Sequence, residues 1–179
     1  MNEAALRAHL VKLLDWPDAH VNLEVAGKGI PPRLRGSVPP GWEHSAWQLV
    51  EHVRIAQADI LEFCRSAKYR EKKWPDDYWP PSRAPRHAAA WNQSLAATRR
   101  DRKAFQRLAA DKTIDLTAAI PHGAGQTYLR EILLTADHTA YHVGQIVYLA
   151  KHFAGPAWKS LSIPKGKSAE FAQATYKTR

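Results

Sequence analysis

Proline placement is the feature that most limits how this chain can fold. The twelve prolines are concentrated in a few stretches, and proline interrupts regular structure because it lacks a backbone N–H and restricts the backbone. Between these stretches lie four segments in which apolar residues recur every three or four positions, as on a helix with one buried face. The four segments cover residues 3–15, 45–66, 87–111 and 127–153.

This pattern predicts an all-α protein. No segment shows the convincing polar–apolar alternation of a strand, and four long helices joined by loops favour an antiparallel four-helix bundle. Ser45 and Gln48 have the spacing of a capping box at the start of the second long helix. A shorter helix is expected from Asp18, which can cap it, to about Ala26. Long proline-rich loops are expected at 27–44 and 69–86.

The composition fits one folded domain. The chain has 179 residues, 45% of them hydrophobic, and seven tryptophans, which is enough apolar material for a core. We expect a single domain over residues 1–179, with the bundle at about 1–158 and a basic tail at 159–179.

Charge and hydropathy narrow the choice of partners. The formal net charge is +9, but the basic residues form separate clusters, which argues against a nucleic-acid surface. No apolar run reaches the ~18 residues of a membrane span, so no membrane partner is expected. Cys64 is the only cysteine, and the first residues lack the pattern of a secretory signal. We therefore expect a cytoplasmic protein.

Two histidines in the last helical segment raise the question of metal binding. His138 and His142 stand four residues apart, which on a helix places their Cβ atoms ~5–6 Å from each other. Their imidazoles could then converge on one ion. The pair alone does not distinguish metal ligands from two independent histidines.

A helical projection of residues 127–153 separates an apolar face from a polar one. The apolar face is complete without the histidines and is expected to make the core contact; it comprises Leu129, Ile132, Leu133, Ala136, Ala140, Val143, Val147 and Ala150. The opposite face carries Glu131, Thr135, His138, His142 and Gln145. Two imidazoles, a glutamate and a glutamine among aliphatic residues are unusual for a solvated face.

A third ligand could come from the second long helix. His52 shares an inward face with Leu49, Ala56, Ile60 and Phe63, where a lone histidine is more often a hydrogen-bonded core residue. If the second and fourth long helices are neighbours, however, His52 can meet His138 and His142 in the groove between them. The sequence thus predicts a metal site of three histidines with open coordination positions.

Two segments resemble the DinB-like (DinB/YfiT) superfamily of metal-dependent enzymes. They are "HSAWQLVEHVRIAQADILEF" at 44–63 and "TYLREILLTADHTAYHVGQIVYLAKHF" at 127–153. The resemblance implies a four-helix bundle with a divalent metal held by one histidine of the second helix and two of the last. In this chain those residues are His52, His138 and His142.

The resemblance also implies classes of chemistry. Several relatives are thiol transferases, or isomerases that depend on a low-molecular-weight thiol, and others are described as hydrolases. We therefore expect a metal-dependent transferase or hydrolase with a small-molecule substrate, and a low-molecular-weight thiol as a candidate co-substrate. Three histidines suit zinc best and are compatible with nickel, iron or manganese. A homodimer through helix faces is compatible with the pattern.

Further roles stay open at this point. Glu131 and Gln145 are the candidate catalytic residues, one to orient an imidazole or act as a base and the other to bind a ligand. The loop at 69–86 is interpreted as a lid over one end of the bundle that selects substrates. Two other hypotheses are a non-catalytic bundle that binds a metal or small ligand, and a basic protein that interacts with nucleic acid and has structural histidines.

Overall fold

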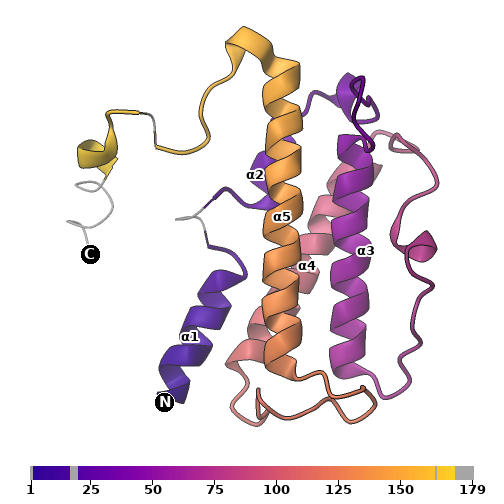
Figure 1. Ribbon diagram of the computed structural model, residues 1–179, viewed down its shortest axis with the longest axis vertical. Coiled ribbons are helices and arrows are strands. Elements are labelled where there is room, and N and C mark those ends of the chain that lie inside the picture. Colours follow the sequence, from indigo (N-terminus) through magenta and orange to yellow (C-terminus); the bar gives the residue numbers. More distant parts are fainter. Residues whose placement is uncertain (1, 17–19, 164, 172–179) are drawn as a thin grey trace.

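The computed structural model describes residues 2–16, 20–163 and 165–171. This part of the chain is helical and has no β-strand, which confirms the all-α prediction (Figure 1). Its α-helices are α1 (Glu3–Leu13), α2 (Leu23–Lys28), α3 (Ala46–Arg65), α4 (Ala90–Ala110) and α5 (Tyr128–Ala154). Three short 3-10 helices accompany them: η1 (Pro32–Leu34), η2 (Asp76–Tyr78) and η3 (Gly155–Ala157).

Side-chain caps set where the long helices begin. At α3 the Gln48 amide donates to Ser45 Oγ at 3.2 Å, and the Ser45 amide donates to Gln48 Oε1 at 3.1 Å, so the capping box is present as predicted. At α5 the Arg130 amide donates to Thr127 Oγ1 at 3.2 Å. Each bond satisfies an amide that has no partner within the helix.

The short helix α2 begins later than predicted. Its cap is Asn22, whose side-chain oxygen accepts from the Val25 amide at 3.0 Å. His20, Val21 and Asn22 are not helical, and the expected cap Asp18 lies outside the described residues. The prediction was wrong at this boundary because asparagine caps a helix as well as aspartate does, and Asn22 stands directly before the buried residue Leu23.

The helices pack around α3 and α5, which lie side by side with α4 behind them (Figure 1). Helix α3 contacts α4 and α5, α1 contacts mainly α4, and α2 contacts mainly α5. Buried apolar residues form two clusters, one around Val50 and Trp91 and the other around Phe105 and Ile132. Polar side chains are buried between the clusters on all three long helices: His52, Gln57 and Asp59 on α3, Ser94 and Thr98 on α4, and Thr135 and His142 on α5.

Much of the predicted core face of α5 is buried, including Ile132, Val143 and Ala150, but the helix buries more than that face. The histidine face was expected to lie opposite the core face, but His142 is only 5% exposed and Leu133 is 44% exposed. Glu131 and Thr135 are buried as well. The reason is that α5 contacts all four other α-helices, so more than one of its faces is covered and the polar face turns into the protein.

The loop at 69–86 also takes a different place from the one expected. It was interpreted as a lid over one end of the bundle, but it runs lengthwise along α3 (Figure 1), and its η2 segment contacts α3. It therefore covers the side of the helix that carries His52. Within the described residues, no helix has the length and apolar character needed to cross a membrane.

Candidate metal centre

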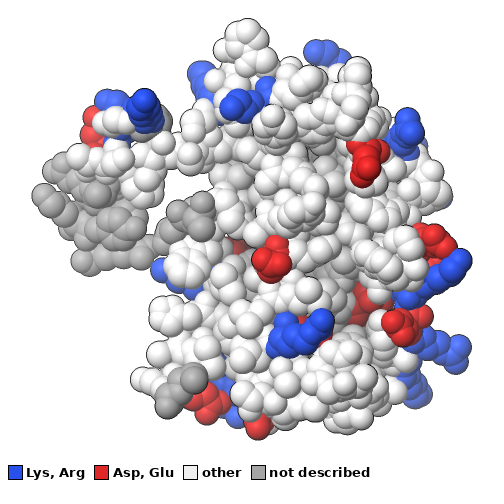
Figure 2. Space-filling model, in the orientation of Figure 1, with Lys and Arg blue, Asp and Glu red and all other residues white. Residues whose placement is uncertain are grey.

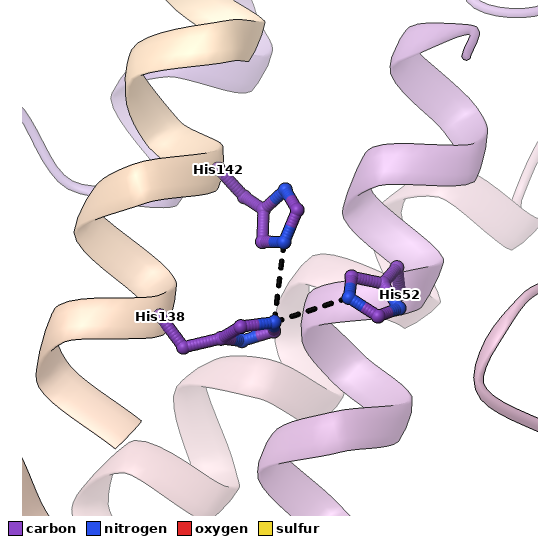
Figure 3. A group of neighbouring side chains, drawn as sticks. All are labelled: His52, His138 and His142. Atoms are coloured by element: carbon purple, nitrogen blue, oxygen red, sulfur yellow. Dashed lines mark hydrogen bonds between the residues drawn. The ribbon is translucent and has the colours of Figure 1, made fainter. Parts of the chain in front are cut away.

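Three histidine side chains converge in the polar layer between α3 and α5 (Figure 3). His52 comes from α3, whereas His138 and His142 stand one turn apart on α5. The Nε2 atom of His138 lies 3.1 Å from the Nε2 of His52 and 3.1 Å from that of His142. One ligand atom from each residue can be chosen so that all lie within 4.8 Å of one another. The structure thus brings together the three histidines that the sequence nominated, and the group could hold a metal ion.

Contacts on the far side of two of the rings establish which nitrogen carries the proton. His52 Nδ1 lies 2.9 Å from the backbone carbonyl oxygen of Tyr78, and His142 Nδ1 lies 2.7 Å from Gln145 Oε1. A carbonyl or amide oxygen can only accept, so both Nδ1 atoms donate. In the neutral rings both Nε2 atoms then carry a lone pair that points at His138.

With both other rings protonated at Nδ1, only His138 can carry a proton on its Nε2 atom. His138 Nε2–H could donate to one of its two neighbours, but it cannot form a well-aligned bond to both. At least one of the Nε2 lone pairs of His52 and His142 would then lie 3.1 Å from His138 Nε2 without an aligned proton to accept. A cation would satisfy that lone pair, and imidazoles bound to one zinc ion at 2.0–2.1 Å have nitrogens about 3.3 Å apart. The donor set and its spacing therefore fit a divalent metal.

Burial keeps the imidazoles neutral and ready to act as ligands. Loss of hydration lowers the pKa of His138 to about 4 and that of His142 to about 4, with a further contribution from the neighbouring histidines. Burial also lowers the pKa of His52, although its bond to the Tyr78 carbonyl opposes the shift. A metal competes with protons for these nitrogens, so the low pKa values favour metal binding at neutral pH.

The loop at 69–86 supplies contacts to the cluster that the sequence did not indicate. Trp79 stacks on His52, with ring centroids 4.0 Å apart and an angle of 5° between the planes. The other face of Trp79 stacks on His44 at 4.0 Å. Together with the Tyr78 carbonyl, this stack holds His52 on two sides.

Asp59 anchors that loop to α3. It is buried, and its Oδ2 accepts from the Tyr78 hydroxyl at 2.6 Å and from the Tyr69 hydroxyl at 3.1 Å. Burial and, after it, the neighbouring Asp59 carboxylate raise the pKa of Tyr69 to about 12 and raise the pKa of Tyr78 as well. Asp59 is two turns from His52 on the same side of α3. Its link to the histidine cluster runs through Tyr78, so it is visible only once the loop is placed.

The two candidate catalytic residues occupy different places. Gln145 contacts His142 directly. Glu131 is buried two turns away from His138, where its carboxylate pairs with Arg130 and lines a separate cavity with Asp59 and His122. The structure therefore brings Gln145, and not Glu131, to the histidine cluster.

A groove opens beside the cluster. It has a volume of about 610 Å³ and lies between the loop before α3 and the second half of α5. We call it the aromatic groove; its lining includes Trp42, His44, Tyr141, Gly144, Gln145 and Tyr148. Tyr141 contacts the His142 ring edge to face, with centroids 4.9 Å apart. Gln145 accepts a hydrogen bond from His142. The groove thus reaches the residues that surround the histidine cluster.

Fold and site together define an all-α protein with a buried group of three histidines that could hold a metal ion. A family model described as "Protein of unknown function (DUF1572)" matches residues 90–167. This segment contains α4 and α5, and with them His138 and His142, whereas His52 precedes it. No curated protein matches the chain, and no solved structure matches it.

Proposed function

We propose that this chain is a metal-dependent enzyme of the DinB-like type, in which His52, His138 and His142 hold one divalent ion. The observation that carries the proposal is the convergence of their Nε2 atoms at 3.1 Å while two of the Nδ1 atoms are engaged elsewhere. In this proposal α1, α3, α4 and α5 are the four helices of the bundle. The match of the family model over α4 and α5 supports a shared architecture for that half of the site.

The donor set favours zinc, with nickel, iron or manganese compatible with the same three imidazoles. Bound to three neutral ligands with positions left open, such an ion would lower the pKa of a water to ~7 or stabilise a thiolate. Both chemistries of the proposal, thiol transfer and metal-assisted hydrolysis of a small molecule, depend on that property. A low-molecular-weight thiol is the co-substrate of the first.

The protein's own residues would position the ligands. The Tyr78 carbonyl and Gln145 Oε1 each hold an Nδ1–H, so the Nε2 lone pairs of His52 and His142 stay directed at the centre. Trp79 covers one face of His52 and excludes water from it. Outer contacts of this kind orient metal-bound histidines and raise their basicity.

Metal content of protein purified without an affinity tag tests the site. We expect near-stoichiometric metal in the wild type and strong depletion in His142→Ala, because two imidazoles bind a divalent ion much more weakly than three. His9→Ala is the control, since His9 is an exposed histidine of α1, a helix that carries none of the three candidate ligands. If wild type and His142→Ala contain equally little metal after metal-replete growth, the proposed site does not exist.

An activity screen separates an enzyme from a non-catalytic metal-binding bundle. Low-molecular-weight thiols would be combined with electrophilic acceptors, and simple esters and amides would be tested for hydrolysis, each with added Zn²⁺, Ni²⁺ or Mn²⁺. We expect turnover that is lost in His142→Ala and retained in His9→Ala. Stoichiometric metal without turnover in any of these reactions would favour the binding module.

A further inference from the structure

The aromatic groove has the size and lining of a small-molecule site. Its volume of about 610 Å³ falls within the range of ligand pockets, which are mostly apolar with a few polar groups. Trp42 stacks on Tyr148, with centroids 5.3 Å apart and 14° between the ring planes, and makes one wall. Tyr141 and Tyr148 are each 63% exposed, so large aromatic surfaces face the solvent beside the groove.

A glycine in α5 opens the middle of this surface. Gly144 lies three residues after Tyr141 and four before Tyr148, so the three share one helix face. Apart from Gly144, its two chain neighbours and the nearby backbone of α5, no atom of the described residues comes within 4 Å of the position that a Cβ on Gly144 would take. Glycine disfavours a helix interior relative to alanine, and no neighbour requires its absence of a side chain here. An α-helix rises 1.5 Å per residue, so Tyr141 and Tyr148 leave α5 about 10 Å apart along its axis, with Gly144 between them.

The charge of the lining residues indicates what kind of ring the groove would bind. None of the ten described lining residues is lysine or arginine, in a protein of net charge +9. The one carboxylate among these ten residues belongs to Glu43, whose Oε2 lies 3.9 Å from His44 Nε2. In Figure 2 the surface over α5 is uncharged between basic side chains near the top of the helix and an acidic side chain lower down. An anionic ligand would find no lysine or arginine among these lining residues, whereas an uncharged aromatic one would find rings to stack on.

We infer that the aromatic groove binds an uncharged, flat aromatic molecule over Gly144, with its inner end at Gln145. Gln145 contacts His142, so a bound molecule would lie next to the histidine cluster. That this molecule is the acceptor substrate of the metal site rests on the proposed function. The binding itself does not, because every residue invoked for it lies outside the three histidines.

Binding of 2-naphthol, measured by isothermal titration calorimetry on metal-free protein, tests the inference. We expect one saturable site in the wild type, and binding at least tenfold weaker for naphthalene-2-sulfonate and for cyclohexanol. Gly144→Leu should weaken 2-naphthol binding at least tenfold by filling the gap. Lys103→Leu, which places the same side chain on an exposed position of α4, a helix that contributes none of the lining residues, should leave it unchanged.

Gly144→Ala keeps the test decisive if the leucine variant does not fold. It should raise the melting temperature, because alanine favours the helix, and still weaken 2-naphthol binding severalfold. Absence of 2-naphthol binding to the wild type, or equal binding to wild type and Gly144→Ala, would overturn the inference. Since the protein is metal-free in these titrations, either result leaves the metal-content test of the proposed function untouched.

Discussion

The side-chain atoms behind the histidines decide how well they can bind a metal. An imidazole with a free Nδ1 can rotate or change tautomer, and either change turns its lone pair away from the centre. In this protein Gln145 holds His142 from the side chain, whereas Tyr78 holds His52 from the backbone. A substitution of Gln145 therefore removes its contact with His142 directly, whereas any residue at position 78 still has a backbone carbonyl.

Gln145→Leu should lower zinc affinity about 10- to 100-fold, the range found when the hydrogen-bond partner of a metal-bound histidine is lost. Competition with a chromophoric chelator would measure the change. Gln145→Glu keeps an acceptor at the same position and should bind zinc at least as well as the wild type. Equal affinities for the leucine and glutamate variants would show that the contact to His142 Nδ1 is unimportant.

Among the structural elements, the loop at 69–86 is the one that connects distant parts of the site. Asp59 of α3 accepts from two hydroxyls of the loop, and the Tyr78 carbonyl accepts from His52 of the same helix. The loop is thus fixed at both points to one rigid helix. Tyr78 makes one contact with its hydroxyl and the other with its backbone carbonyl. The bond to Asp59 therefore helps to hold the carbonyl in place against His52.

Tyr78→Phe should weaken zinc binding more than Tyr69→Phe does. Each variant removes one hydrogen bond to the same buried carboxylate, which costs about 1–3 kcal/mol of stability for a bond to a charged group. Only Tyr78 also presents its carbonyl to His52. Zinc affinity and urea unfolding of the pair would be measured in parallel; similar losses of affinity in both variants would contradict the proposed coupling through the loop.

For the molecule as a whole, the buried polar layer makes stability depend on pH. His138 and His142 have pKa values of about 4 in the folded protein, against ~6.5 in an unfolded chain. As the pH falls below 6.5 the unfolded chain takes up protons that the folded protein excludes, so folding becomes less favourable until the pH reaches about 4. The full stability is reached only above a pH of ~6.5, where the histidines are neutral in the unfolded chain as well.

The midpoint of urea unfolding of metal-free protein should therefore fall between pH 7.5 and pH 5. The double variant His138→Asn, His142→Asn lacks both titrating groups and should show a clearly smaller fall over the same interval. Measurements in the presence of a chelator keep bound metal from adding its own pH dependence. An equal fall in the wild type and the double variant would assign the pH dependence to other groups.

The basic side chains are scattered over the surface, as they are along the sequence. Figure 2 shows basic and acidic side chains interspersed on the face that it presents, without a continuous basic stripe. A net charge of +9 spread in this way favours solubility more than the recognition of one anionic surface. The third hypothesis, a basic nucleic-acid-interacting protein, gains no support from this face.

Local patterns were enough to predict the helices and the three histidines. Prolines and caps mark the helix ends, and a helix needs only neighbouring residues for its hydrogen bonds, so α3, α4 and α5 fall within a few residues of their predicted bounds. The spacing of His138 and His142 follows from helix geometry alone. His52 could be nominated because it lies on the inward side of α3.

Tertiary packing decided the rest, because it depends on contacts between residues far apart in the chain. The apolar face of α5 predicted only part of its buried surface, since a helix covered on several sides buries more than its most apolar stripe. The path of the loop at 69–86 could not be predicted from its own composition, because it depends on the hydrogen bonds that Tyr69 and Tyr78 donate to Asp59 of α3. Helix periodicity therefore places His138 and His142 together, but only the packing of α3 against α5 brings His52 to them and Tyr78 behind it.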